Sequence, residues 1–460
     1  MSDILRSVGL DVGTTSTQMI FSELTVENKA SGFAVPEMEI VRRDIRYKSP
    51  VHFTPLLDES HVDAPSLREL VAEEYRKAGI RREDVDTGAI IITGETSRKE
   101  NARAVLEALS DFAGEFVVAT AGPDLESVLA AKGAGAVEYS QQTGKTVLHM
   151  DIGGGTSNLA LIRGGKIERT GCLNVGGRLL KFDGEGTVTY VSPVLDGLCD
   201  LKPGDKVDPG QLKAIAEILT QALEMAAGLR EETPLLARLT TEEAGRFPPC
   251  REENLVISFS GGVADCVDKA LPWLQFGDLG PILGQTIRES RLCRGAFTLG
   301  SETIRATVIG AGCHSAQLSG STVFHQNVPF PLKNVPVVPL TDISRENLRR
   351  EQEKQEGCAI LAFPGLASPN YREVAAMAEE IAAGTEGTVL VCLEQDMAKA
   401  LGQALALRLG PNAEILCIDR VKVGPGSYLD VGAPVGPALP VVVKTLVLGR
   451  AEQTAEGRST

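Results

Sequence analysis

Two short glycine-rich stretches, each led by an aspartate, are the residues of this chain whose types and spacing could do chemistry. Residues 150–160 read MDIGGGTSNLA and residues 10–20 read LDVGTTSTQMI, and the two align without gaps. In this alignment Asp11 falls on Asp151, and Gln18 falls on Asn158. Each stretch lies between two apolar runs, which predicts a strand, a tight polar turn and a second strand.

Turns of this kind are suited to holding phosphate. Glycine permits a positive φ and the close approach of another group, so the amides and hydroxyls of a turn can converge on an anion. A carboxylate at the end of the preceding strand suits hydrated Mg²⁺, which prefers oxygen ligands and retains several waters. We therefore expect the two turns to clamp one polyphosphate. The alternative, ordinary glycine hairpins, is weaker for two matching copies than for one.

The clamp hypothesis assigns a role to each residue of the two turns. We expect Asp11 and Asp151 to be catalytic and to orient the attacking water and the waters around Mg²⁺. Glu95 follows the apolar run at 88–92 and is a further catalytic candidate. The expected phosphate contacts are Gly13, Thr14, Thr15, Ser16, Gly153, Gly154, Gly155 and Thr156.

Composition excludes several classes of partner. The 460 residues carry a formal net charge of −15, which argues against nucleic acid or an anionic membrane surface, because both need basic patches. No apolar run approaches the ~20 residues that span a bilayer. The nine cysteines form no C-x-x-C pair, which indicates reduced thiols in the cytoplasm. The sequence leaves open a homo-oligomer and an association with a bacterial microcompartment.

One further motif resembles a nucleotide loop but does not fit one. Residues 143–146 read TGKT, as at the end of a P-loop. A P-loop needs a glycine five places before Gly144, and Tyr139 stands there. His149 lies in the apolar run before the second turn, and we expect it to be a core or lining residue.

The order of the motifs resembles the actin-like ATPase superfamily. After the two acidic turns come S-G-G at 260–262, behind an apolar run, and GAG at 310–312. The resemblance implies an α/β protein of two duplicated lobes that close on Mg-ATP. It predicts a first lobe at 1–145, to which about 310–340 returns, and a second lobe at 146–309. The pattern changes after 357, so 357–450 is expected to be a small C-terminal α/β domain.

The same resemblance suggests roles for residues outside the two turns. Gly261 and Gly262 would let adenine or ribose lie against the backbone. Gly310 and Gly312 would permit close packing of a hinge, and Gly310 is counted among the nucleotide-binding residues. Glu126 matches the place of a metal-proximal glutamate in chaperone-type members, although the helix dipole alone would favour an acid there. No residue clearly matches the lysine that those members place near the γ-phosphate, which predicts slow hydrolysis.

Over nearly its whole length the chain is similar, more specifically, to the EutA family of reactivating factors for ethanolamine ammonia-lyase. This resemblance implies a chaperone-like, weak ATPase that uses ATP or ADP and Mg²⁺ in ethanolamine utilization. Its partner would be an adenosylcobalamin enzyme that holds a damaged cobalamin, which is exchanged for intact adenosylcobalamin. The alternatives are a small-metabolite kinase of the superfamily and an actin-like filament former. The most specific stretches are TGETSRKENA (93–102), FGDLGPILGQTIRES (276–290) and GSYLDVGAPVGPALPVVVKTLVLG (426–449).

Overall fold

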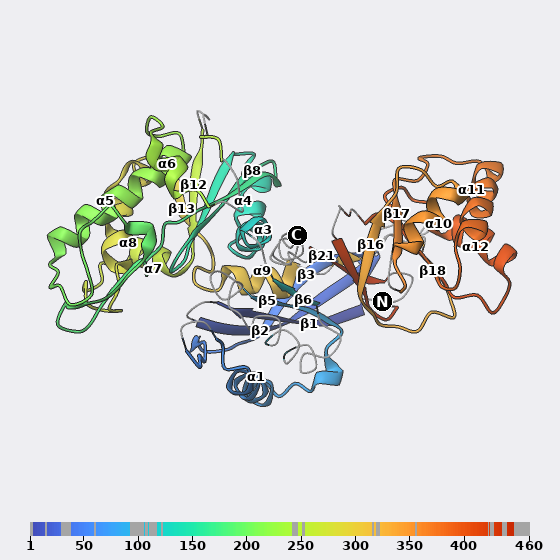
Figure 1. Ribbon diagram of the computed structural model, residues 1–460, viewed down its shortest axis with the longest axis horizontal. Coiled ribbons are helices and arrows are strands. Elements are labelled where there is room, and N and C mark those ends of the chain that lie inside the picture. Colours follow the sequence, from blue (N-terminus) through green and yellow to red (C-terminus); the bar gives the residue numbers. More distant parts are fainter. Residues whose placement is uncertain are drawn as a thin grey trace, which may run out of the picture.

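The computed structural model arranges the chain as two lobes and a C-terminal domain (Figure 1). No helix in the described ranges is long and apolar enough to cross a membrane. The predicted site residues Thr14, Thr15 and Glu95 lie outside the described residues. The structure describes residues 3–13, 16–28, 38–58, 61–92, 105, 109, 117–120, 123–241, 247–250, 254–314, 317–318, 323–354, 357–421, 423, 427–434 and 439–445.

The first lobe is built on one mixed sheet whose central strand carries Asp11. Its strands are β1 (Asp3–Val12), β2 (Ser16–Asn28), β3 (Met38–Lys48), β4 (His52–Phe53), β5 (Thr87–Ile92) and β6 (Val117–Thr120). The order across the sheet is β3-β2-β1-β5-β6, with β4 beside β2. Helix α1 (Ala64–Ala78) covers one face and begins where the side chain of Asp63 accepts a hydrogen bond from Ser66 N. A 3₁₀ turn at Arg82–Asp84 leads from this helix into β5.

The second lobe repeats the strand order of the first. Its strands are β7 (Val147–Ile152), β8 (Ser157–Arg163), β9 (Lys166–Leu173), β12 (Val256–Ser260) and β13 (Phe297–Leu299). The order β9-β8-β7-β12-β13 matches β3-β2-β1-β5-β6 position by position, and the strand directions agree as well. The predicted duplication of an α/β lobe is therefore confirmed.

The remaining elements of the second lobe enclose its core. Helix α5 begins with Pro209 behind a capping box formed by Asp208 and Gln211, and ten of its residues are buried. The elements are α4 (Ala136–Thr143), β10 (Leu180–Phe182), β11 (Val188–Val191), α5 (Pro209–Ala226), α6 (Pro234–Leu239), α7 (Gly262–Asp268), α8 (Gly280–Glu289) and 3₁₀ turns at Pro193–Leu195 and Arg291–Cys293. The TGKT motif begins at the last residue of α4 and leads into strand β7, so it does not open a helix.

Two helices of small residues connect the lobes. Helices α3 (Pro123–Gly133) and α9 (Ala306–His314) pack against each other between the two sheets (Figure 1). A Cβ on Gly310 would overlap the carbonyl oxygen of Leu129 in α3, so this crossing requires glycine. Gly312 contacts the backbone of β1 in the same way. The close backbone contact explains the GAG segment by packing alone.

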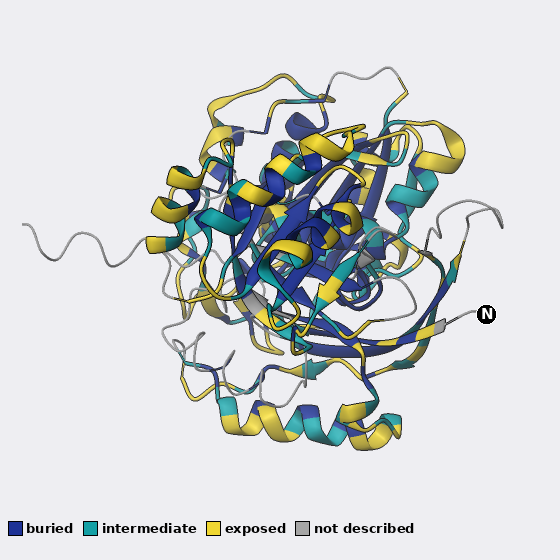
Figure 2. Cartoon of the chain, turned by 90° about the vertical axis from the view of Figure 1, so that its right-hand side faces the viewer, coloured by how far each residue is buried: buried dark blue, intermediate teal, exposed yellow. Residues whose placement is uncertain are grey.

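The C-terminal domain contains an eight-stranded sheet in the order β14-β21-β20-β16-β17-β18-β19-β15. Figure 2 shows its helices with exposed outer surfaces and largely buried strands behind them. Its elements are β14 (Gln317–Leu318), β15 (Phe324–Gln326), β16 (Leu332–Pro339), α10 (Arg345–Glu353), β17 (Ile360–Phe363), α11 (Tyr371–Gly384), β18 (Val389–Leu393), α12 (Ala398–Leu409), β19 (Ile415–Ile418), β20 (Ser427–Val431) and β21 (Pro440–Thr445).

The boundaries of this domain differ from those expected. We expected 310–340 to return to the first lobe, and α9 does pack on β1. Strand β16, however, pairs with β17 and β20, so 332–339 lies within the C-terminal sheet. The sheet therefore starts before residue 357. The sequence pattern could not separate these strands, because a short apolar run fits either sheet equally well until its pairing partner is known.

Candidate functional site

The two aspartates occupy the same position in their sheets. Asp11 is paired across β1 and β2 with Gln18, and Asp151 is paired across β7 and β8 with Asn158. Residues directly opposite each other in an antiparallel pair point to the same face. Each lobe therefore presents one carboxylate and one amide side by side at the end of its central strand.

The two turns are closed by equivalent backbone hydrogen bonds. Gly13 N donates to Ser16 O and Gly153 N donates to Thr156 O, each over 2.9 Å. A Cβ built on Gly155 would meet nothing within 4 Å, so no packing contact requires glycine at this position. Open space above the turn is what the phosphate hypothesis needs.

Asp151 is buried and held by hydroxyl groups. Ser260 Oγ donates to its Oδ1, and Thr307 Oγ1, at the start of α9, donates to its Oδ2 over 3.4 Å. Burial raises the pKa of this carboxyl to about 6, against the opposing effect of the two hydroxyl donors. The side chain is thereby attached to the second lobe and to the hinge at once.

A buried histidine, expected from the sequence to be a core or lining residue, extends this network. His149 is fully buried, with Nδ1 3.0 Å from Ser258 Oγ and Nε2 2.9 Å from Ser260 Oγ. Because Ser260 gives its proton to Asp151, Nε2 must donate to Ser260 and Nδ1 must accept from Ser258. Burial lowers the pKa of the imidazole to about 3, which keeps it neutral. The expectation of a core histidine is confirmed, and the structure adds its partners.

The two paired amides each leave one oxygen without a partner. Gln18 Nε2 donates to Ile304 O over 3.1 Å, and Asn158 Nδ2 donates to Glu126 Oε2 over 2.8 Å. These acceptors fix the orientation of both amides, because an amide oxygen could not donate to them. Gln18 Oε1 and Asn158 Oδ1 are then buried with no hydrogen bond among the described residues. The alignment of the two turns was the signal that could have found them.

The donor set at these strand ends fits magnesium. Two carboxylates and two buried amide oxygens are hard oxygen ligands of the kind that Mg²⁺ prefers. The described residues contain no group of three or more His, Cys, Asp or Glu side chains placed to hold a metal ion. A metal ion held here would therefore retain several waters, as Mg²⁺ usually does.

Glu126 is brought to the second turn by the hinge. It lies in the first turn of α3, is buried, and accepts the hydrogen bond from Asn158, the residue opposite Asp151. The helix dipole alone would not require that partner. Its catalytic role stays a prediction.

The S-G-G turn lies against the end of β7. Gly261 has φ +85°, and a Cβ there would overlap the carbonyl of Ile152, so packing alone requires this glycine. Gly262 is the first residue of α7. Nucleotide contacts by Gly261, Gly262 and Gly310 stay predictions. Packing accounts for Gly261 and Gly310, and Gly262 takes its place as the first residue of α7.

The segment before α9 joins the two lobes. Glu302 forms an ion pair with Lys48 of β3, and Arg305 donates from an Nη to Ser49 O over 3.0 Å. Ile304 O accepts from Gln18, as described above. These contacts place a lobe-to-lobe connection directly beside the two turns.

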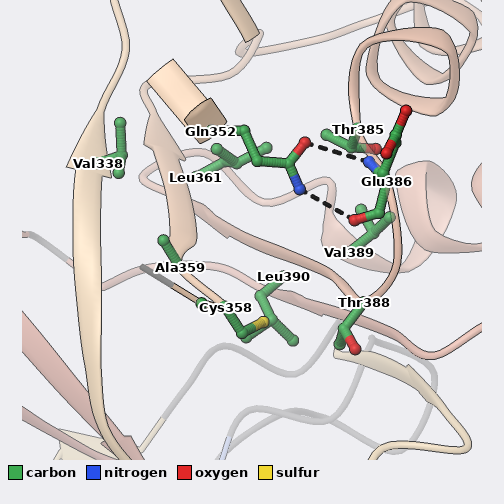
Figure 3. Close-up of a pocket in the computed structure, with 11 residues that line it drawn as sticks. Val338, Gln352, Cys358, Ala359, Leu361, Thr385, Glu386, Thr388, Val389 and Leu390 are labelled. Atoms are coloured by element: carbon green, nitrogen blue, oxygen red, sulfur yellow. Dashed lines mark hydrogen bonds between the residues drawn. The ribbon is translucent and has the colours of Figure 1, made fainter. Parts of the chain in front are cut away.

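A separate cavity of about 260 Å³ lies in the C-terminal domain (Figure 3). Gln352 and Glu386 close one side by a reciprocal pair, with Gln352 Nε2 donating to Glu386 O over 2.9 Å and Glu386 N donating to Gln352 Oε1 over 3.1 Å. Cys358 also lines it. No predicted site residue does, so this cavity is distinct from the two turns.

Two relatives and one family model assign this chain to a single family. The chain is 40% identical to the "Ethanolamine ammonia-lyase reactivase EutA" of Salmonella typhimurium, over 96% of this chain and 98% of that protein. It is 39% identical to the protein of the same name from Escherichia coli, over the same shares. Among solved structures, the Ppx/GppA enzyme of Aquifex aeolicus is 12% identical, covers 67% of this chain and 99% of its own, and has a TM-score of 0.42. The family described as "Ethanolamine utilisation protein EutA" matches residues 3–449, and the chain belongs to it.

Proposed function

We propose that this protein is an ATP-dependent reactivating factor for ethanolamine ammonia-lyase. It binds the inactive enzyme and promotes exchange of a damaged cobalamin for intact adenosylcobalamin. The membership of the family and the names of two relatives, each about 40% identical over nearly the full length, support this function. The kinase alternative is not favoured by these relatives.

The observation that carries the nucleotide part of the proposal is the repeated pair of an aspartate and an amide. Asp11 with Gln18, and Asp151 with Asn158, stand at equivalent register positions of two duplicated sheets. Between the sheets cross two helices in backbone contact. A ligand that bridges the two turns would favour one angle between the lobes over another.

The residues of the site would divide the work of a slow ATPase. The amides of Gly154 and Gly155 would bind phosphate, while the amides of Gly13 and Gly153 close the two turns around it. Asp11 and Asp151 would orient water. Mg²⁺, when bound, would neutralise phosphate charge at the carboxylate and amide oxygens. Thr307 joins Asp151 to α9, so a shift of this carboxylate on hydrolysis would reach the hinge directly.

ADP would occupy the same site as ATP. The protein would act in the cytoplasm. The client contact would respond to the lobe angle, because a ligand can shift only an equilibrium whose two states it distinguishes. Association with a bacterial microcompartment would follow the location of the client enzyme.

Recovery of the client's activity tests the whole proposal. Ethanolamine ammonia-lyase is inactivated with an adenosyl-lacking cobalamin and mixed with this protein, Mg-ATP and free adenosylcobalamin. We expect deaminating activity to return, and to return far more slowly when ATP is omitted. The matched control is Asp151→Asn, which keeps the size of the side chain and removes the charge. Equal recovery with and without this protein would contradict the proposal.

A further inference from the structure

The second turn carries a cation on its outer side. Residues 176–178 read Gly-Gly-Arg and lie directly against 153–155. Gly177 N donates to Gly153 O over 3.0 Å, and Arg178 N donates to Gly154 O over 2.6 Å. The arginine is thus fixed to the turn through its own backbone.

Two glycines make this approach possible. A Cβ on Gly176 would overlap the carbonyl of Gly154, and a Cβ on Gly177 would stand 2.9 Å from Gly280 Cα at the start of α8. Neither position has a positive φ, so the requirement is one of space. The Gly-Gly-Arg segment is therefore built to bring the residue after the glycines onto the turn.

The side chain of Arg178 then lies over Gly154. A Cβ built on Gly154 would be 3.3 Å from Arg178 Cδ and 3.5 Å from Arg178 Cγ, which is close van der Waals contact. The side chain is 30% exposed, so part of the guanidinium reaches solvent. The methylene groups of Arg178 cover Gly154, and the charged guanidinium extends past it.

A buried carboxylate holds one edge of the guanidinium. Arg178 Nε lies 3.2 Å from Asp278 Oδ2, and Asp278 Oδ1 accepts from Gly280 N over 2.9 Å. The Asp278 side chain is 9% exposed. Among the described residues, Asp278 binds the guanidinium through Nε. The edge formed by the two terminal nitrogens then remains to bind another group. A guanidinium offers five donors, and its free edge can bind phosphate in two places at once.

We propose that Arg178 binds the terminal phosphate of the nucleotide, and that Asp278 is the positioning residue for its guanidinium. Asp151, three residues before Gly154, is the residue proposed to orient the attacking water, so the phosphorus under attack must lie at this turn. A cation fixed to the same turn faces that phosphate. Arg178 then supplies the charge for which the sequence offers no lysine.

The inference rests on the proposed nucleotide site, and its test separates the two. Binding of Mg-ADP and of Mg²⁺ with a non-hydrolysable ATP analogue is measured by calorimetry for the parent and for Arg178→Gln. We expect the variant to bind ADP about as well as the parent and to bind the analogue about 10- to 100-fold more weakly, as loss of a charge-assisted hydrogen bond implies. Arg178→Lys should recover part of the loss.

Two further variants complete the test. Arg163→Gln removes a cation at the end of β8 farthest from the second turn, where it pairs with Glu168 of β9, and it should change neither affinity. Arg178→Gln combined with Asp278→Asn avoids a buried unpaired carboxylate, so a folded protein remains to be measured if the single variant is unstable. Asp278→Asn alone should weaken binding of the ATP analogue by a smaller factor than Arg178→Gln does. It should leave binding of ADP unchanged.

The outcomes are distinct. If Arg178→Gln weakens binding of ADP and of the analogue equally, or weakens neither, the role of Arg178 is overturned and the nucleotide site stays intact. A parent protein that binds neither ligand would overturn the proposed function, and the role of Arg178 with it.

Discussion

His149 and Ser260 are joined by a buried hydrogen bond of 2.9 Å between Nε2 and Oγ, and the same Ser260 hydroxyl donates to Asp151. The hydroxyl can donate only once, so its direction is set by the neutral imidazole behind it. Chains of hydrogen bonds strengthen one another in a low-dielectric interior. The orientation of Asp151 therefore depends on two residues that no ligand would touch.

The first prediction removes the link in this chain. Ser260→Ala leaves His149 Nε2 without an acceptor, and we expect the free energy of unfolding to fall by about 1–3 kcal/mol. ATP hydrolysis should fall about tenfold or more, since Asp151 loses the donor that orients it. Ser140→Ala removes a buried hydroxyl of α4 that donates to Lys145 O, and it should affect stability alone. Equal hydrolysis by both variants would contradict a role for Ser260 in orienting Asp151.

The second prediction concerns pH. Because the pKa of Asp151 is raised to about 6 in the folded state, its contribution to stability is complete below its ordinary pKa and is lost as pH rises through about 6. Asp151→Asn does not ionise and escapes this loss. Without nucleotide or Mg²⁺, the variant should gain roughly 2–3 kcal/mol in free energy of unfolding relative to the parent between pH 4 and 7. Urea unfolding at several pH values measures the difference, and a constant difference would argue against an acid held protonated by burial.

The third prediction separates a phosphate turn from a glycine hairpin. Gly155→Ala meets no atom within 4 Å, so the nucleotide-free melting temperature should stay near that of the parent. If phosphate lies over this turn, the stabilisation that Mg-ATP gives the parent should shrink or vanish. Gly184→Ala, equally open and placed between β10 and β11, should retain it in full. A Gly155→Ala protein that Mg-ATP stabilises as much as the parent would show that phosphate does not need this glycine.

The fourth prediction tests the hinge. Gly310→Ala places a methyl group on the carbonyl of Leu129, so α3 and α9 must move apart. We expect a loss of about 1–3 kcal/mol, as for other overpacked positions. Gly295→Ala, with open space around it, is the matched control and should cost little. Nucleotide binding should weaken only as far as the lobe angle changes, so intact binding with lost stability would mark Gly310 as a packing residue alone.

The fifth prediction concerns the two matched aspartates. Asp11→Asn and Asp151→Asn should each lower ATP hydrolysis by a few kcal/mol at the transition state, about 10²-fold or more, as deletion of an electrostatic group does elsewhere. Asp11→Asn should change the free energy of unfolding by less than this, and Asp151→Asn should change it only by the pH-dependent amount of the second prediction. Steady-state hydrolysis and thermal melts of both variants provide the measurement. Parent-like hydrolysis in both would mark the two aspartates as turn caps.

The sequence alone was sufficient to predict the duplication. An ungapped match of eleven residues, with an acid, one glycine and an amide at the same places, can be read without coordinates because strand pairing preserves local spacing. The two strand-turn-strand units were predictable for the same reason, since local pattern encodes local structure. The two lobes and the hinge between them were expected from the family resemblance, because the contact of α3 with α9 joins segments far apart in the chain.

What only the tertiary structure decided is which distant residues meet at those turns. Arg178 reaches Gly154 through a Gly-Gly segment 24 residues on, and Ser260 reaches Asp151 from 109 residues away. Neither approach leaves a periodic signal, because each depends on how two backbones pass each other in space. The C-terminal sheet was mislocated at its start for the same reason, since β16 is recognisable only by the strands it pairs with. These contacts are set by packing between distant segments and not by spacing along the chain. Only the tertiary structure could therefore reveal them.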